Sequence, residues 1–295
     1  MSTAPTGTDE CSAKFEFVST RIAVHRCIAK DTWQLTVEAP ELARRTVPGQ
    51  FFMVRIAGRN DPLIGRALAM YDRHLGKDGK PEAVSVVYTV KGKFTQALSH
   101  CVEGDLVELW GPLGNGFSTQ TVEHLILVAG GVGQTPMLTL ASAALGIPKY
   151  SVAGYPSGFA KKVTLCYGAR SKDYLAGLSD FEKTGMDIRI ATDDGSMGHH
   201  GRVTDVLRKV LTESNGSTGQ ITRIACCGPE PMMEAVSELA IQQGVPCEVS
   251  LETPMACGIG ICFTCVAKIK QPDGEWDYQR TCIKGPVFEA EKIVW

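Results

Sequence analysis

Four cysteines near the carboxyl end constrain this chain more than any other feature. Cys257, Cys262 and Cys265 have the spacing C-x4-C-x2-C, and Cys282 follows after a polar segment. This is the plant-type [2Fe–2S] spacing, in which four thiolates hold two irons. Two glycines between the first two cysteines reach positive φ at little cost, so the backbone can fold tightly around a metal core.

Other uses of these cysteines compete with the cluster. Zinc is also held by four cysteines, but its usual ribbons place them in two short pairs, whereas three here fall within nine residues. A disulfide framework is disfavoured, because four cysteines in a large chain that looks intracellular indicate metal or redox use. Unrelated buried thiols would not be expected at this spacing. We therefore predict an iron–sulfur site at Cys257, Cys262, Cys265 and Cys282, with zinc as the alternative metal.

The amino-acid composition of the chain is that of a soluble globular protein. A chain of 295 residues has material for about two domains, and its formal net charge of −2 gives no indication of nucleic-acid binding. No run of about 18 apolar residues is present, so no membrane-spanning helix is expected. Residues 1–12 lack the basic and apolar regions of a signal peptide and look like a loose tail. The eleven cysteines, an odd number, argue against secretion. We expect a cytoplasmic protein.

The segment from residue 14 to 116 has short alternating runs broken by proline and glycine, as strands do. Their regular spacing suggests a small antiparallel barrel. The predicted strands are Phe15–His25, Thr32–Glu38, Gln50–Ile56, Ala67–Asp72, Ala83–Val90 and Leu106–Trp110.

One candidate ligand position in this barrel is Arg66, at the start of an otherwise apolar strand. A guanidinium there can pair bidentately with a phosphate. The alternative is an arginine that is solvated or paired with Asp61.

A second candidate position follows the fifth predicted strand. Val87–Thr89 leads through Lys91–Thr95 into a short predicted helix, Gln96–His100. Backbone amides and the Thr95 hydroxyl at a helix start favour an anion, although an ordinary helix cap would look the same. Tyr88 either stacks on a ligand ring or packs in the barrel.

Near residue 117 the pattern changes to alternating strands and helices, which predicts a parallel, doubly wound sheet. His124–Ala129 is a continuous apolar strand, Gly130–Pro136 is a glycine loop, and Met137–Leu145 is a helix, which together form a phosphate cradle. The loop departs from G-x-G-x-x-G. Further strands are predicted at Val163–Tyr167, Asp187–Ala191, Ile221–Cys227 and Pro246–Leu251, and further helices at Asp173–Thr184, Val203–Thr212 and Met232–Gly244.

Ligands in such sheets bind beyond the carboxyl ends of the strands. Gly130–Thr135, Thr192–Ser196 and Cys227–Pro231 all fall at such ends. Cys227 either lies beside a nicotinamide or is an ordinary buried thiol. Asp193 and its neighbour either bind a ribose or cap a turn. No Ser/His/Asp arrangement of the hydrolase kind is present.

These segments, in this order, resemble the ferredoxin–NADP reductase superfamily over nearly the whole chain after residue 14. The matching motifs are PGQFF at 48–52, AGGVGQTPML at 129–138, CGPEPMM at 227–233 and the terminal cysteines. SLETPMACGIGICFTCV at 250–266, RTCIKGPVF at 280–288 and TDDGSMGHHGRVTD at 192–205 are similar to the electron-transfer subunits of dihydroorotate dehydrogenase B, an NAD-linked enzyme of pyrimidine synthesis.

The resemblance implies an antiparallel β-barrel with FAD at 14–116, a doubly wound α/β domain with NAD at 117–250, and a small C-terminal [2Fe–2S] domain at 251–295. The flavin motif of the family, Arg-Pro-x-Ser, falls on Arg66 to Ala69, where Ala67 replaces the proline and Ala69 the serine. Phe94 replaces the glycine usual before Thr95, and FAD is still expected. The flavin contacts carried over are Arg66, Ala67, Leu68, Ala69, Val87, Tyr88, Thr89, Phe94 and Thr95, and the nucleotide contacts are Gly130, Gly131, Gly133, Thr135, Cys227, Gly228 and Pro229.

The function implied by the resemblance is a relay of electrons. An FMN-containing partner subunit, in a heterotetramer, oxidises dihydroorotate, and the electrons reach NAD⁺ through the cluster and FAD of this chain. No acid or base from this chain is expected to be needed, and apolar residues of the cluster loop (Ile259, Ile261 and Phe263) either dock the partner or pack beneath the cluster. The rival functions are a small subunit of another flavin/iron–sulfur reductase, of the bifurcating ferredoxin:NADP or sulfide dehydrogenase type, and a non-catalytic scaffold with an empty flavin site. Whether Arg170 and Lys172 select NADP over NAD is left open by the sequence.

Overall fold

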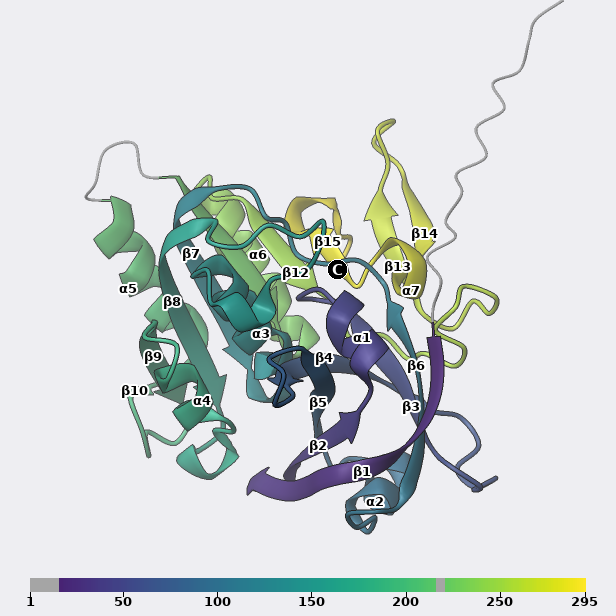
Figure 1. Cartoon of the computed structure of the whole chain (residues 1–295). Coiled ribbons are helices and arrows are strands. Elements are labelled where there is room, and N and C mark those ends of the chain that lie inside the picture. The colour runs from purple at the N-terminus through teal and green to yellow at the C-terminus, as the bar shows by residue number, and fades with distance from the viewer. Residues whose placement is uncertain (1–15, 216–220) are drawn as a thin grey trace, which may run out of the picture.

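The computed structural model describes residues 16–215 and 221–295. The predicted tail, residues 1–12, and Phe15 at the start of the first predicted strand lie outside these described residues. Figure 1 shows a β-barrel beside a layered α/β region, with the yellow C-terminal segment next to both. The predicted order of barrel, α/β region and C-terminal segment is confirmed.

Six antiparallel strands close the barrel in the order β1-β2-β5-β4-β3-β6. Alternating side chains such as Leu35, Val54 and Leu109 point inward and form the barrel core. Because the side chains of a strand alternate between its faces, a slip of one residue would expose this apolar set, and the pattern therefore fixes the register. The strands are β1 Glu16–Ala29, β2 Thr32–Glu38, β3 Phe51–Ile56, β4 Arg66–Leu75, β5 Pro81–Thr89 and β6 Leu106–Leu113.

Two short helices pack on the barrel core. Helix α1, Pro40–Arg45, was not predicted, because six residues starting with a proline carry little helical pattern. Helix α2 spans Lys93–Ser99 and begins three residues before the predicted Gln96. The earlier start has a local cause, since the Thr95 hydroxyl accepts the Gly92 N–H at 3.1 Å and caps the first turn.

The α/β region is a seven-stranded sheet with the order β10-β9-β8-β7-β11-β12-β15. Its strands are parallel except β15, which runs antiparallel to β12 at one edge. The central strand β7 is buried on both faces, as its continuous apolar sequence predicts. The strands are β7 Val122–Gly130, β8 Ala160–Ala169, β9 Asp187–Thr192, β10 His199–His200, β11 Thr222–Cys227, β12 Cys247–Ser250 and β15 Val287–Glu289.

Helices cover both faces of this sheet, so the predicted doubly wound arrangement is confirmed. On the face towards the barrel, α3 and α4 share one core with barrel residues such as Tyr71 and Val87. On the opposite face, α5 and α6 form a second core with the sheet. The helices are α3 Thr135–Ala144, α4 Leu178–Glu182, α5 Val203–Asn215 and α6 Glu230–Gln242, and the turns before α3, β8 and α4 are the 3₁₀ helices η1 Gly131–Gln134, η2 Pro148–Tyr150 and η3 Lys172–Tyr174.

The predicted helix Asp173–Thr184 is wrong as a single element. The structure has η3 and α4 there, separated by Gly177, which has a left-handed φ of 73°. A right-handed helix cannot continue through that conformation. The left-handed turn brings Asp180, in α4, beneath the barrel residue Tyr71.

The C-terminal segment contains a loop, a hairpin and a short helix that the sequence did not predict. Strands β13 Val266–Lys270 and β14 Trp276–Arg280 form the hairpin. Helix α7, Thr281–Lys284, carries Cys282, after which β15 joins the sheet and η4, Ala290–Lys292, follows. The loop that carries Cys257, Cys262 and Cys265 therefore precedes the hairpin, and the chain then returns to the sheet through β15.

Buried polar contacts fix the barrel against the α/β region. The Tyr71 hydroxyl donates to Asp180 at 2.9 Å, and Arg73, only 1% exposed, donates to the carbonyls of Thr46, Lys149 and Ser151. Buried hydrogen bonds of charged groups are costly to lose, so they hold one relative position of the two parts. None of the helices in residues 16–215 and 221–295 has the length and apolar character needed to span a bilayer.

Candidate functional site

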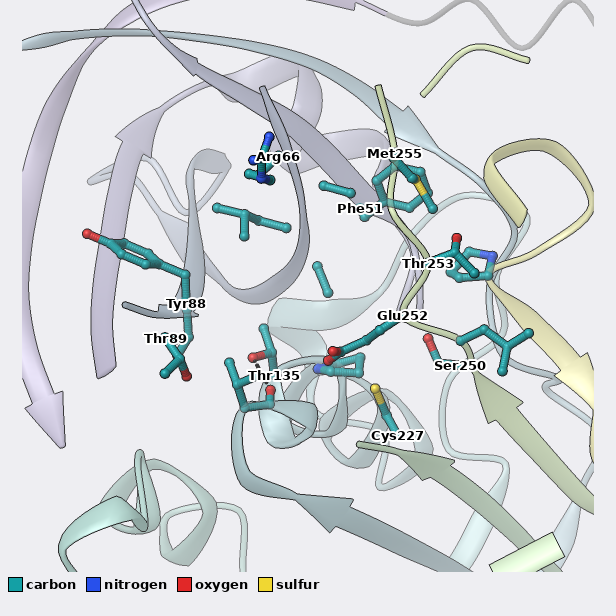
Figure 2. A pocket seen from close by; sticks show the side chains of 18 of the residues that line it. Phe51, Arg66, Tyr88, Thr89, Thr135, Cys227, Ser250, Glu252, Thr253 and Met255 are labelled. Atoms are coloured by element: carbon teal, nitrogen blue, oxygen red, sulfur yellow. Dashed lines mark hydrogen bonds between the residues drawn. The ribbon is translucent and has the colours of Figure 1, made fainter. Parts of the chain in front are cut away.

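A cavity of about 550 Å³ lies between the barrel and the segment that follows β12. Its size is in the usual range for a small-molecule or cofactor site. Figure 2 shows Arg66, Tyr88 and Thr89 on the barrel side and Cys227, Ser250 and Thr253 on the other. The structure brings all the predicted flavin residues to this one cavity: Arg66, Ala67, Leu68, Ala69, Val87, Tyr88, Thr89, Phe94 and Thr95.

Arg66 lies at the rim of this cavity and does not pair with Asp61. Asp61 instead accepts a hydrogen bond from the Lys93 ammonium at 2.6 Å. The Arg66 guanidinium lies over the buried Phe94 ring, 5.8 Å from its centroid, and donates to the carbonyl of Ile64. One of its nitrogens therefore has an internal partner, and the remaining N–H groups can donate to a phosphate.

Of the two predicted uses of the Thr95 hydroxyl, the structure shows the helix cap. The hydroxyl accepts hydrogen bonds from the amides of Lys91 and Gly92 and donates to the Gly92 carbonyl at 3.0 Å. These contacts saturate the hydroxyl, so Thr95 shapes the loop before α2. Lys91 and Gly92 line the cavity beside it.

Tyr88 fits both of its predicted uses. Its side chain is buried in the barrel, and its hydroxyl lies 2.9 Å from the Nε2 of His25. The same residue forms part of the cavity wall, where an aromatic face can contact a planar ring. The pKa of Tyr88 is raised by burial, so the hydroxyl stays neutral.

The opposite wall of the cavity was not predicted. It consists of residues directly after β12, which lie at the carboxyl end of a sheet strand and could have been found by the strand-end rule. Burial raises the pKa of Glu252 in this wall, and the nearby Lys91 acts in the opposite direction. The residues are Ser250, Leu251, Glu252, Thr253, Pro254 and Met255.

A second cavity, of about 490 Å³, lies at the carboxyl ends of β7, β8, β9 and β11. Of the predicted nucleotide residues, Gly130, Gly131 and Pro229 line this second cavity, whereas Thr135 and Cys227 line the first. Thr89 and Val132 line both, so the two cavities adjoin. Two ligands bound in the two cavities, or one extended ligand that spans them, would therefore lie in contact.

Gly133 and Gly228 line neither cavity. A Cβ on Gly133 would lie 2.3 Å from the Cys227 carbonyl oxygen, and one on Gly228, at φ +155°, would lie 2.7 Å from the Cε of Met232. These glycines permit close packing of the two loops behind the cavity. They position the wall without forming its surface.

The charged residues near the second cavity divide into two groups. Arg170 lines it and lies over the Tyr174 ring, 4.3 Å from its centroid, while Asp193 lines it from the end of β9. Asp194 instead caps a turn, accepting the Ser196 amide at 2.9 Å. Lys172 does not line the cavity.

The four predicted metal ligands come together as two pairs of free thiols. The Sγ atoms of Cys257 and Cys262 are 3.3 Å apart, and Cys265 and Cys282 pack in one apolar cluster, near enough for Cys265 to help raise the pKa of Cys282. Hydrogen bonds from Thr264 lower the pKa of Cys262 to about 6, and burial raises the pKa of Cys282 to about 12. Over residues 16–215 and 221–295, no group of three or more His, Cys, Asp or Glu side chains is arranged to hold a metal ion. Two pairs of thiols can each hold one iron, so these four side chains suit a centre with two irons.

The cysteine loop packs directly on the wall of the first cavity. Phe51 and Met255 line that cavity and also pack against Cys265 and Cys282 in one apolar cluster. The Trp110 indole donates to the Cys257 carbonyl at 3.0 Å, which ties the loop to β6. Thiols and cavity therefore share a wall.

Three family models match consecutive parts of this chain. They are an oxidoreductase FAD-binding domain at residues 19–117, an oxidoreductase NAD-binding domain at 127–238, and the iron–sulfur cluster binding domain of dihydroorotate dehydrogenase B at 252–294. The barrel wall of the first cavity, most of the second cavity and the four cysteines fall within these three ranges in turn.

The relatives match most of the length of the chain. The dihydroorotate dehydrogenase B (NAD(+)) electron transfer subunit of Caldanaerobacter subterraneus is 32% identical, covering 93% of this chain and 97% of that protein. The subunit of the same name from Geobacillus thermodenitrificans is 36% identical, with 92% and 96% covered. The solved NADH-dependent reduced ferredoxin-NADP oxidoreductase is 28% identical with a TM-score of 0.77, covering 94% of this chain and 90% of that one.

Proposed function

Because this chain belongs to the family of electron transfer subunits of dihydroorotate dehydrogenase B, we propose that it carries electrons from a dihydroorotate-oxidising partner to NAD⁺. One observation supports this most: the thiol pairs, the barrel cavity and the strand-end cavity are contiguous. A route from iron to flavin to nicotinamide needs that arrangement. The chain is then an oxidoreductase subunit of pyrimidine biosynthesis.

The cofactors supply the redox chemistry: the cluster moves single electrons, and FAD collects two for a hydride. The residues of this chain hold and orient them. We propose that Cys257 and Cys262 bind one iron and Cys265 and Cys282 the other, as their pairing suggests.

For the flavin and the nucleotide, we propose binding by the walls of the two cavities. Arg66 and Lys91 supply positive charge to the FAD pyrophosphate, and Tyr88 and Thr89 face its ring system. Gly130, Gly131 and Pro229, together with the start of α3, hold the NAD pyrophosphate. Cys227 and Thr135 lie where the nicotinamide would enter the flavin cavity.

The partner surface that we propose surrounds the cysteine loop. Ile261 and Phe263 are 75% and 73% exposed, whereas Ile259 packs into the apolar cluster beneath the loop. Two hairpin residues, Trp276 and Tyr278, are also largely exposed. Exposed apolar groups of this size favour a protein interface, which we assign to an FMN-containing catalytic subunit in a heterotetramer. The free thiols fit a reducing compartment, which we take to be the cytoplasm.

The test is anaerobic copurification with the neighbouring catalytic subunit, followed by an assay of dihydroorotate-driven NAD⁺ reduction. Cys265→Ser removes a ligand and is expected to abolish the reaction, while Cys27→Ser, an exposed cysteine on β1, serves as the matched control and retains it. Turnover of reduced ferredoxin in place of dihydroorotate would support the bifurcating-reductase alternative. A correctly assembled complex without flavin would support the scaffold alternative.

A further inference from the structure

Glu252 is the one acidic residue among the described residues that line the first cavity. Figure 2 shows its carboxyl group pointing into the cavity, with Thr135 and Cys227 on the adjoining wall. The carboxyl has no hydrogen bond or ion pair with any described residue. Its negative charge is close enough to Cys227 to help raise the pKa of that thiol, after the larger effect of burial. An unpaired carboxyl group therefore occupies the place where flavin and nicotinamide are proposed to meet.

The surroundings of Glu252 favour its protonated form. The cavity wall around it is mainly apolar, with Phe51, Leu251 and Met255, and burial raises its pKa. The titratable and charged groups that face the cavity from other elements are Arg66 on β4, Tyr88 on β5, Lys91 before α2 and Cys227 on β11. Lys91 is the charged group that opposes the effect of burial. The Glu252 side chain remains accessible to solvent, and its apolar neighbours shift its pKa upward relative to a glutamate surrounded by water.

The proposed reaction requires a proton that the cluster does not deliver. The reduction NAD⁺ + 2e⁻ + H⁺ → NADH takes up one proton for each electron pair, and the iron–sulfur centre supplies electrons alone. With FAD bound in the first cavity, the cavity wall would have to supply this proton to the flavin before hydride transfer. Glu252 lies in the cavity wall and is also accessible to solvent, so it can exchange a proton with water and deliver it inside the cavity.

We propose that Glu252 is the proton-transfer residue of this cavity: its carboxyl O–H bond breaks as the flavin N5–H bond forms, and solvent water then reprotonates the carboxylate. This inference rests on the proposed binding of FAD in the first cavity. In the reverse direction NADH gives its hydride to the flavin without a proton from the protein, and Glu252 accepts the N5 proton when the electrons leave singly. It departs from the expectation from the sequence that no acid or base from this chain is needed.

Other protic side chains of the cavity are committed elsewhere. The Tyr88 hydroxyl is paired with His25, the Thr95 hydroxyl is saturated by the α2 cap, and the Thr135 hydroxyl donates to the Val132 carbonyl at 2.6 Å. The Cys227 thiol has a pKa raised far above its ordinary value by burial, so it holds its proton too tightly to exchange it. Among the described residues that line the cavity, Glu252 is the one carboxyl group, and its oxygens have no hydrogen-bond partner.

The two directions of proton movement allow a test that does not use the catalytic partner's reaction. In the FAD- and cluster-loaded complex, NADH is the reductant and ferricyanide the one-electron acceptor, and both phases are followed by stopped flow. For Glu252→Gln, we expect hydride arrival from NADH to change by less than about threefold and flavin reoxidation to slow by about 100-fold or more, in the range of general acid–base effects. Glu252→Ala should be rescued by added formate, and Glu291→Gln, an exposed glutamate in η4, is the control.

A spectroscopic measurement supplies a readout apart from rate. Redox-induced infrared difference spectra of the same complex should contain a carboxyl band that changes on flavin reduction and is absent in Glu252→Gln. Equal slowing of both phases, unchanged reoxidation, or a carboxyl band that persists in the variant would overturn the proposal. A complex with normal NADH–ferricyanide chemistry but no dihydroorotate-driven NAD⁺ reduction would refute the proposed function alone, whereas absence of FAD would refute both.

Discussion

Gly258, inside the cysteine loop, is the position where a single methyl group should damage the redox site most specifically. It has a left-handed φ of +73°, and a Cβ there would lie 2.6 Å from the Cγ of Met53 and 2.9 Å from the Cδ1 of Leu113. Both neighbours are buried in the cluster that supports Cys265 and Cys282. We predict that Gly258→Ala displaces the cysteine loop and causes loss of the iron–sulfur cluster.

The cost of this change has two parts. Left-handed backbone costs a non-glycine residue about 1–2 kcal/mol. Overpacking a filled core adds about 1–3 kcal/mol. The hairpin turn provides a control, because Gly274 has φ +89° but a Cβ there would meet nothing within 4 Å. Gly274→Ala therefore carries the backbone cost alone, and the two variants should differ by the packing part, about 1–3 kcal/mol.

The assay is loss of cluster absorbance in the complex during an anaerobic iron-chelator challenge, together with urea unfolding of the same proteins. We expect Gly258→Ala to lose iron at least several-fold faster than the wild type and to lower the unfolding midpoint more than Gly274→Ala does. The rate of iron loss from Gly274→Ala and the FAD content of Gly258→Ala should stay close to wild type. Equal cluster retention in the two alanine variants would show that the loop does not rest on Met53 and Leu113 as described.

Three further changes test other parts of the structure. Burial lowers the pKa of His124 to about 4 from 6.5, so the stability that the neutral imidazole contributes is complete above pH 6.5 and is lost as the pH falls from 6.5 through 4. Urea unfolding measured against pH should show a loss of about 3 kcal/mol over this range, and His124→Gln should reduce that loss. Ala69→Ser restores the hydroxyl of the family's flavin motif and should tighten FAD binding by about 0.5–1.5 kcal/mol in a fluorescence titration, and unchanged affinity would mean that the hydroxyl does not reach the flavin. Tyr71→Phe removes the hydrogen bond to Asp180 between barrel and sheet and should cost about 1.5–3 kcal/mol by calorimetry, with no change in iron content.

The sequence predicted the features that are set by local pattern. Cysteine spacing located four thiols that the fold brings together in pairs, and the alternating and continuous apolar runs located most strands of the barrel and sheet. The flavin motif residues were all placed on one cavity, although two of them are alanines. These features can be predicted because each is determined by residues that are close together in the sequence.

The features that depend on distant contacts were missed. Glu252 falls within the matched segment at 250–266, but that segment was read for its cysteines, and Glu252 becomes a cavity residue because β12 places it opposite the barrel. The break at Gly177 accompanies a contact with the distant Tyr71, whose hydroxyl would lie 2.3 Å from a Cβ at Gly177, and such a contact is not visible in a local helical pattern. Gly133 and Gly228 belong to a binding motif, but the structure uses them for loop packing behind the wall.

The most direct test of the relay is a stepwise anaerobic titration of the purified complex with NADH, followed optically after analysis for iron, zinc and flavin. The account predicts two irons and one FAD for each copy of this chain, and bleaching of both the flavin and the cluster bands as NADH is added. Zinc in place of iron, or a flavin that bleaches while the cluster stays oxidised, would contradict it.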